Sequence, residues 1–182
     1  MGRDAYPLTS LMTLWDYTGD QLYLDFARQT AIRLLATQHD DGGFSTQAAV
    51  GVLTGVSCVP EKNSISFGSG LLAPIELLEW ATRDRRWPAD FQPRLRRWAD
   101  LVLRLQTAEG VWTQANGTPY PLIGAGMLFS LIKAGQLLQD RRCVDAVQRY
   151  LTAMNARQDF VAGTHAFLSA LYAHVADRAL KP

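Results

Sequence analysis

The chain has 182 residues, of which 48% are hydrophobic, and its 18 Lys and Arg residues nearly balance 17 Asp and Glu residues, leaving a net charge of +1. This length suits a single domain over residues 1–182, and the balanced charge excludes a global field that would attract nucleic acid or an anionic membrane. No apolar run reaches the ~18 residues that a membrane-spanning helix needs.

The N-terminal segment, residues 1–6, contains charged residues and no apolar signal segment, so the cytoplasm is the default compartment, although the localisation stays open. A first helix is expected after this segment. It supplies the apolar residues Leu8, Leu11, Leu14 and Trp15.

A turn at Thr18-Gly19-Asp20 separates the first helix from a second, Gln21 to Thr37. We expect Gly19 to take a positive φ in this turn. The helical spacing of the second helix predicts a buried stripe of Leu22, Phe26, Ile32 and Leu35. Its polar residues Asp25, Arg28, Gln29 and Arg33 are expected off that stripe.

Residues 39–67 show no helical periodicity and are predicted to form a long loop of the kind that serves as a lid or binding loop. A helix is expected over Leu71 to Ala81, where Pro74 is tolerated if it lies in the first turn. An amphipathic helix over Phe91 to Gln106 follows.

The C-terminal part repeats the pattern with Leu122 to Leu138, which is apolar on nearly every face, then amphipathic Cys143 to Ala156, then Thr164 to Ala176. Helices that are apolar all round are typically packed on all sides, so we assign them as inner and the amphipathic ones as outer. The chain is therefore predicted to be all-α, with about three and a half antiparallel helix hairpins.

An internal repeat supports this organisation. The outer helices end in similar segments, Gln38 to Phe44 and Gln106 to Trp112, and a shorter copy ends at Gln158-Asp159-Phe160. Cys58 and Cys143 lack metal-ligand spacing, so we expect no metal or cofactor; they are either buried small residues or disulfide partners in an exported protein.

The stretch from Tyr17 to Leu24, followed by Gln38 and Asp41-Gly42-Gly43-Phe44, resembles the hairpin signature of the six-hairpin glycosidase superfamily. The resemblance implies an incomplete α/α toroid. It also implies a carbohydrate-active enzyme, or a fragment of one, that hydrolyses or eliminates at uronate-containing or related saccharides. A closed toroid has more hairpins than this chain, so a homodimer or a partner domain of a longer chain is expected.

The segments Gln38 to Phe44 and Gln106 to Trp112 also resemble the QW repeats of triterpene cyclases, in which glutamine, glycine and an aromatic residue tie one hairpin to the next. This resemblance implies an isoprenoid-binding relative as an alternative. The DxDD proton donor of squalene-hopene-type cyclases is absent, since Asp40-Asp41 is only a pair. A non-catalytic helical binding scaffold is the third alternative.

In alternating inner and outer helices, all outer-to-inner connections emerge at the same end, which is where we expect the site. The predicted acid and base residues are Asp4, Asp40, Asp41 and His165. The predicted saccharide-binding residues are Arg3, Tyr6, His39, Glu61, Trp112, Asn116 and Tyr120.

Each of these assignments has a structural alternative. Asp41 precedes two glycines and is typical of a turn whose Asp bonds its own backbone. Phe44 and Trp112 share a repeat position, which is more typical of packing between hairpins than of ligand binding. Glu61 fits a solvated loop charge, and His165 fits a capped helix start.

Overall fold

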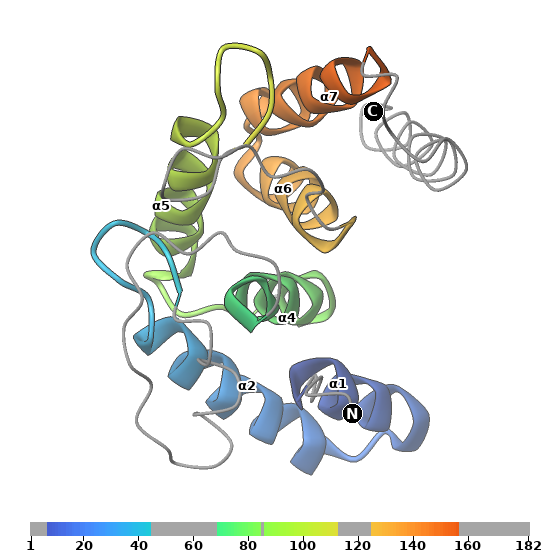
Figure 1. Cartoon of the computed structure of the whole chain (residues 1–182). Coiled ribbons are helices and arrows are strands. Elements are labelled where there is room, and N and C mark those ends of the chain that lie inside the picture. The colour runs from blue at the N-terminus through green and yellow to red at the C-terminus, as the bar shows by residue number, and fades with distance from the viewer. Residues whose placement is uncertain (1–6, 45–68, 85, 113–124, 157–182) are drawn as a thin grey trace. The chain divides into compact units, whose positions relative to one another are not determined.

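In a computed structural model, the chain is described over residues 7–44, 69–84, 86–112 and 125–156. These residues form six helices and no strand (Figure 1): α1 Pro7–Thr18, α2 Gln21–Ala36, α4 Ser69–Arg83, α5 Phe91–Arg104, α6 Ala125–Leu138 and α7 Arg141–Asn155. The all-α expectation is confirmed for these parts of the chain. The expected helix over Thr164 to Ala176 and most of the loop over 39–67 lie outside the described residues.

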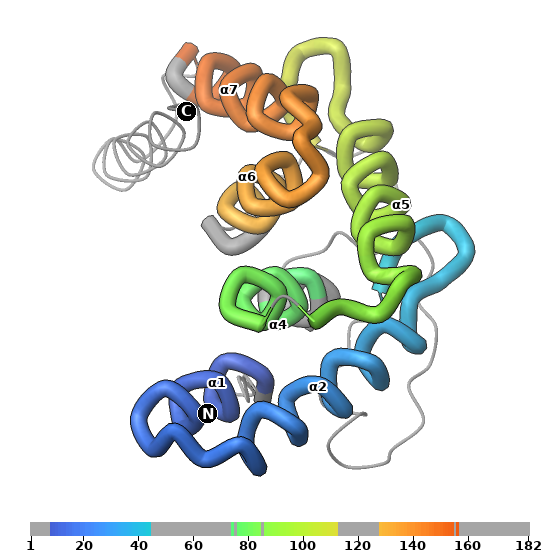
Figure 2. The backbone as a smooth tube through the Cα atoms, turned by 180° about the vertical axis from the view of Figure 1, so that it is seen from behind, coloured from blue at the N-terminus to red at the C-terminus, as the bar shows by residue number. Residues whose placement is uncertain are grey.

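The chain divides into two compact units, residues 1–98 and 99–182, and the division falls within α5. In the first unit α1 packs against α2 and α4, and α2 also packs against α4. In the second unit α6 and α7 pack against each other as a hairpin (Figure 2).

The α1–α2 and α6–α7 turns share two features, a residue with positive φ and an aspartate after it that caps the next helix. Gly19 has a φ of 68° and Asp20 caps α2, its side chain accepting a 2.9 Å hydrogen bond from the Leu22 N–H. Gln139 has a φ of 53° and Asp140 caps α7 by accepting a 3.1 Å bond from the Arg142 N–H. The positive φ predicted for Gly19 is confirmed. The α6–α7 turn adopts this conformation without glycine.

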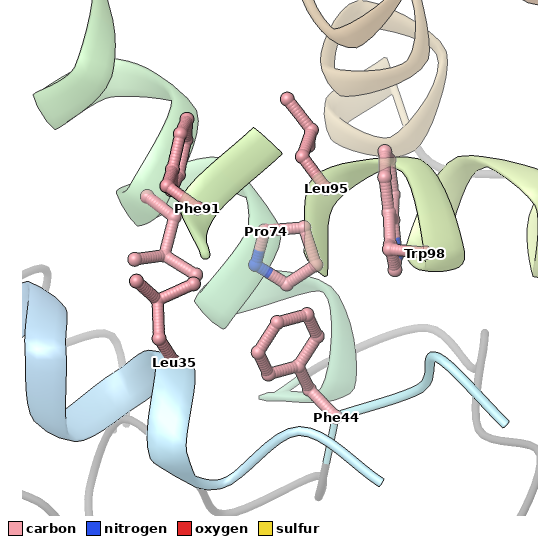
Figure 3. A pocket seen from close by; sticks show the side chains of 7 residues that line it. Leu35, Phe44, Pro74, Phe91, Leu95 and Trp98 are labelled. Carbon is pink, nitrogen blue, oxygen red and sulfur yellow. The ribbon is translucent and has the colours of Figure 1, made fainter. Parts of the chain in front are cut away.

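The core of the first unit lies where α2, α4 and α5 meet. Leu35, Phe44, Pro74, Leu77, Phe91, Leu95 and Trp98 surround a cavity of about 10 Å³. Figure 3 shows Phe44 and Leu35 directed toward Pro74, with the side chains of α5 beside them. A cavity of this size is at the lower limit for a single water molecule, so this core is closely packed.

The stripe predicted for α2 is wrong in three of its four residues. Leu22, Phe26 and Ile32 are 54%, 55% and 47% exposed, and only Leu35 is buried. The buried face consists of Leu24, Ala27, Ala31, Leu34 and Leu35. This face combines Ala27 and Ala31, small residues that let a neighbouring helix approach closely, with three buried leucines.

Pro74 does not lie in the first turn of its helix. Helix α4 begins at Ser69, which places the buried Pro74 in the second turn. Since proline has no N–H, the backbone bond that this position would donate is missing there. The Pro74 ring instead contributes to the core around Phe44.

Candidate functional site

Two segments tie a helix end to the next amphipathic helix, and we call them the first clasp, Gln38 to Phe44, and the second clasp, Gln106 to Trp112. In the first, Gln38 pairs with Phe44 in an isolated antiparallel bridge, and the His39 N–H donates to the Gly43 carbonyl at 2.8 Å. The Gln38 amide Nε2 donates to the Gly42 carbonyl and to the Arg94 carbonyl, both at 2.9 Å. The first clasp is thereby attached to the first turn of α5.

The second clasp repeats this pattern within the second unit. Gln106 pairs with Trp112, and the Thr107 N–H donates to the Val111 carbonyl at 2.7 Å. Gln106 Nε2 donates to the Gly110 carbonyl at 2.9 Å and to the Ala146 carbonyl of α7 at 2.7 Å. The repeat seen in the sequence is therefore also a repeat of hydrogen bonds.

A glycine in each clasp allows close contact with the helix that the clasp holds. Gly42 has a φ of 99° and Gly110 a φ of 84°. A Cβ at Gly42 would collide with the Arg97 carbonyl oxygen, and one at Gly110 would lie 2.9 Å from the Arg149 carbonyl oxygen. Both the conformation and the lack of space require glycine.

The predicted acid and base residues of the first clasp lie at its turn. Asp41 Oδ1 accepts a 2.9 Å bond from the Gly43 N–H, as the turn interpretation expects. Asp40 is exposed, and His39 is half-buried with its Nε2 atom buried and without a hydrogen-bond partner. Of the three, Asp40 is the one most accessible to a ligand.

Trp112 and Phe44 occupy equivalent positions and are both buried. Trp112 is fully buried, its Nε1–H donates to the Val102 carbonyl at 2.7 Å, and its ring lies 5.3 Å from the Tyr150 ring. Phe44 is 3% exposed. These contacts favour the packing interpretation of both aromatic residues over a role as a sugar platform.

The remaining predicted residues lie outside the described residues: Arg3, Asp4, Tyr6, Glu61, Asn116, Tyr120 and His165, together with Cys58. The convergence of Asp4 and His165 with the first clasp therefore stays a prediction. Cys143 is fully buried, with its Cβ facing the backbone of Gly135.

A buried carboxylate in α4 was not singled out from the sequence. Glu76 is fully buried and accepts hydrogen bonds from the Leu8 N–H at 2.5 Å, and from the Thr9 N–H and Thr9 hydroxyl, each at 3.0 Å. Burial raises the pKa of Glu76, against the lowering effect of these bonds. By accepting bonds from two backbone N–H groups in the first turn of α1, the Glu76 carboxylate caps the N-terminus of that helix. The signal in the sequence was an acid directly between the apolar residues Ile75 and Leu77.

Asp84, the residue after the end of α4, forms a largely buried ion pair in the first unit. Its carboxylate accepts bonds of 2.6 Å from Arg28 Nε and 3.2 Å from Arg28 Nη2. Burial acts to raise the pKa of Asp84, but the bonds from Arg28 and the Arg86 N–H outweigh it, and the pKa is lowered. This contact links α2 to α4.

The second unit contains a groove between the second clasp and α7. It has a volume of about 630 Å³ and is lined by Ala108, Glu109, Gly110, Asp145, Gln148, Arg149, Thr152, Ala153 and Ala156. Sequence reasoning missed the α7 residues because they lie on the polar face of an amphipathic helix, which is typical of solvated surface. Only the approach of Gly110 to Arg149 turns that face into one wall of a groove.

Arg149 connects this groove to the second clasp. Its Nε and Nη2 atoms donate to Gln106 Oε1 at 3.2 and 2.7 Å. Gln106 therefore makes two kinds of contact with α7: its Nε2 atom bonds to the helix backbone, and its Oε1 atom holds the Arg149 guanidinium beside the groove. The groove combines one positioned cation, two carboxylates and several hydrogen-bonding groups.

No protein-family model, no curated protein and no solved structure matches this chain. Across residues 7–44, 69–84, 86–112 and 125–156, no three His, Cys, Asp or Glu side chains gather closely enough to hold a metal ion. None of the described helices is long and apolar enough to cross a membrane. The functional argument therefore depends on the clasps and the groove.

Proposed function

We propose that the chain is a carbohydrate-active protein of the α/α-toroid type, and that it binds a saccharide in the groove between the second clasp and α7. The groove is the observation that carries this proposal. It is a shallow groove, open to solvent, with a volume of about 630 Å³.

The lining of the groove suits a ligand rich in hydroxyl groups. Gln148 and Thr152 are both exposed, and they lie four residues apart on α7, so they are on the same face of the helix. Amide and hydroxyl groups both donate and accept hydrogen bonds, as sugar hydroxyls do. Gly110, whose backbone lies against Arg149, forms part of one wall of the groove.

Arg149 is the group that would select an acidic sugar. Because its Nε and Nη2 atoms donate to Gln106, the guanidinium is held in place beside the groove, and Nη1 is the atom that would meet a ligand. A uronate carboxylate would meet a preorganised charged donor there, and such charge-assisted bonds are stronger than neutral ones. This supports uronate-containing saccharides as the substrate class.

Glu109 and Asp145 are the two carboxylates of the groove and the candidates for acid and base. Hydrolysis of a glycosidic bond commonly uses such a pair, one residue protonating the leaving oxygen and the other activating water or attacking the sugar. Elimination at a uronate needs a base for the proton next to the carboxylate. Among the acids predicted from the sequence, Asp40 of the first clasp is exposed, so a ligand can reach it.

Calorimetric titration of the whole chain with a galacturonate oligosaccharide tests the proposal, with a neutral gluco-oligosaccharide alongside. The galacturonate should bind and the neutral sugar should bind less tightly. Thr152→Trp, which fills the groove, should abolish binding. Gln136→Trp, an equal change at an exposed α6 residue outside the groove, should not. Binding that is equal in both variants would reject the groove as the site.

An isoprenoid ligand is the second candidate, and the clasp geometry favours it. In both clasps a glutamine amide, a glycine and a buried aromatic residue tie a helix end to the next amphipathic helix, which is the arrangement that the QW resemblance implies. Titration with farnesol in place of the saccharide separates the two candidates. Saturable binding of farnesol without saccharide binding would favour this second function.

A further inference from the structure

Helices α5 and α7 each receive a clasp at the same position, counted back from the glutamine that follows the helix. The carbonyl that accepts a bond from the clasp glutamine belongs to Arg94 in α5 and to Ala146 in α7. Arg94 lies twelve residues before Gln106, and Ala146 lies twelve residues before Gln158. The place at which a helix receives a clasp can therefore be located in its sequence.

Helix α2 contains the corresponding position, and the residue there is Phe26. Phe26 lies twelve residues before Gln38. It also lies six residues after the N-cap Asp20, as Ala146 lies six residues after the N-cap Asp140. The two ends of the helix thus give the same alignment of α2 with α7.

The surface that a clasp covers on α5 and α7 is uncovered on α2. The clasp aromatic residues lie beside Trp98 in α5 and Tyr150 in α7, and both of these residues are buried. The corresponding residue of α2 is Thr30, which is half-buried. Tyr23 and Phe26 precede it at spacings of three and four residues, so the three lie on one face of the helix. Tyr23 is half-buried and Phe26 is 55% exposed.

We propose that this face of α2, formed by Tyr23, Phe26 and Thr30 and called the acceptor face, binds a clasp that another polypeptide presents. Such a clasp has a glutamine, a glycine four residues later and an aromatic residue six residues later. This spacing occurs only twice in the sequence, in the first and second clasps, and each of these is bound to a helix of its own unit. The occupant of the acceptor face is therefore a partner protein.

Two residues of α2 define the partner further. Gln29 is exposed and corresponds to Arg149, whose side chain donates to Gln106 Oε1. The Gln29 amide can donate in the same way to the glutamine of the partner's clasp. Thr30 is smaller than the tryptophan or tyrosine at its place in α5 and α7, so the acceptor face has room for a large aromatic residue. Tryptophan, as in the second clasp, fits it better than phenylalanine.

A titration of the isotopically labelled full chain with a peptide of residues 105–113 tests the proposal. The peptide contains the second clasp, and a disulfide between cysteines added at its two ends holds the turn closed. Saturable changes of backbone amide shifts should appear at the acceptor face and at Gln29. A Gly110→Ala peptide should bind at least about tenfold more weakly, because the added Cβ would crowd the helix backbone.

A variant of the chain provides the second comparison. Gln29→Ala should weaken binding of the peptide by about threefold, as expected for the loss of one neutral hydrogen bond. Gln136→Ala, the same change at an exposed residue of α6, is the matched control and should leave binding unchanged.

Two outcomes would overturn the proposal. One is the absence of saturable changes on α2 at millimolar peptide, or equal binding of the glycine and alanine peptides. The other is a set of shift changes on α2 that grow with protein concentration when no peptide is present, because a second copy of the chain would then cover the acceptor face.

Discussion

The side chain of Gln106 holds the backbone of Ala146, forty residues further along the chain, by a 2.7 Å hydrogen bond from its amide Nε2 to the Ala146 carbonyl. The second hydrogen of the same amide goes to the Gly110 carbonyl of its own turn. A carbonyl inside a helix can accept such an extra bond because it has two lone pairs. One glutamine thereby fixes both the shape of the turn and its place on α7.

Gln106→Ala removes both of these bonds and the acceptor that positions Arg149. We expect the free energy of unfolding to fall by about 1–3 kcal/mol, since partly buried carbonyls and a guanidinium lose their partner. Urea denaturation measures the loss. Gln136→Ala, at an exposed position of α6, is the control and should cost little. Equal midpoints for the two variants would contradict the clasp as a stabilising element.

Gly42→Ala should be more destabilising than Gly19→Ala, although both glycines have positive φ. At Gly19 a Cβ meets nothing within 4 Å, so only the backbone conformation is penalised, by about 1 kcal/mol. At Gly42 the Cβ also collides with the Arg97 carbonyl, so we expect a loss of more than about 2 kcal/mol. Thermal unfolding of the two variants measures this difference. Similar melting temperatures would show that Gly42 does not lie in close contact with the backbone of α5.

The helix order and most helix ends could be predicted because they depend on local signals. The capping residues Asp20 and Asp140 mark the hairpin turns in the sequence, and Gly19 marks the left-handed residue of the first turn; the left-handed Gln139 of the other turn has no such signal. The buried face of α2 could not be predicted in the same way. Its packing uses Ala27 and Ala31, while the larger Phe26 lies outside, and only the proximity of α1 and α4 decides that.

Fewer features of the candidate site than of the fold could be predicted from the sequence. Asp41 and Trp112 were chosen as polar or aromatic groups near a turn, and both have local structural partners, the Gly43 N–H and the Val102 carbonyl. The groove beside Arg149 depends on contact between residues about forty positions apart. No pattern within either segment shows that contact.

Glu76→Gln should change how stability depends on pH. The pKa of Glu76 is raised on folding above its ordinary value of 4.5, so the folded state favours the neutral form. In the parent, its contribution is fully present below pH 4.5 and is lost as the pH rises through the raised pKa. The glutamine variant lacks this loss. The melting temperature of the variant, measured relative to that of the parent, should therefore rise between pH 4 and 8. A difference in melting temperature that stays constant over this range would contradict a raised pKa of Glu76 in the folded state.

Asp84→Asn should show the opposite dependence. The lowered pKa of Asp84 means that its contact with Arg28 stabilises the fold above the ordinary value of 3.8 and is lost as the pH falls through the lowered pKa. At neutral pH we expect a loss of about 2–4 kcal/mol, because Arg28 keeps a partly buried charge without its main partner. Chemical denaturation at pH 7 and pH 3 should show a large difference from the parent at the first pH and a smaller one at the second.

The most direct measurement of the proposed function is a map of backbone amide chemical shifts during titration with the galacturonate oligosaccharide. We predict that the changes concentrate on the groove, at Glu109, Gly110, Gln148, Arg149 and Thr152, and that they are absent in Thr152→Trp. Saturating changes located elsewhere in the chain, or no change at millimolar saccharide, would contradict the assignment of this groove as a saccharide site.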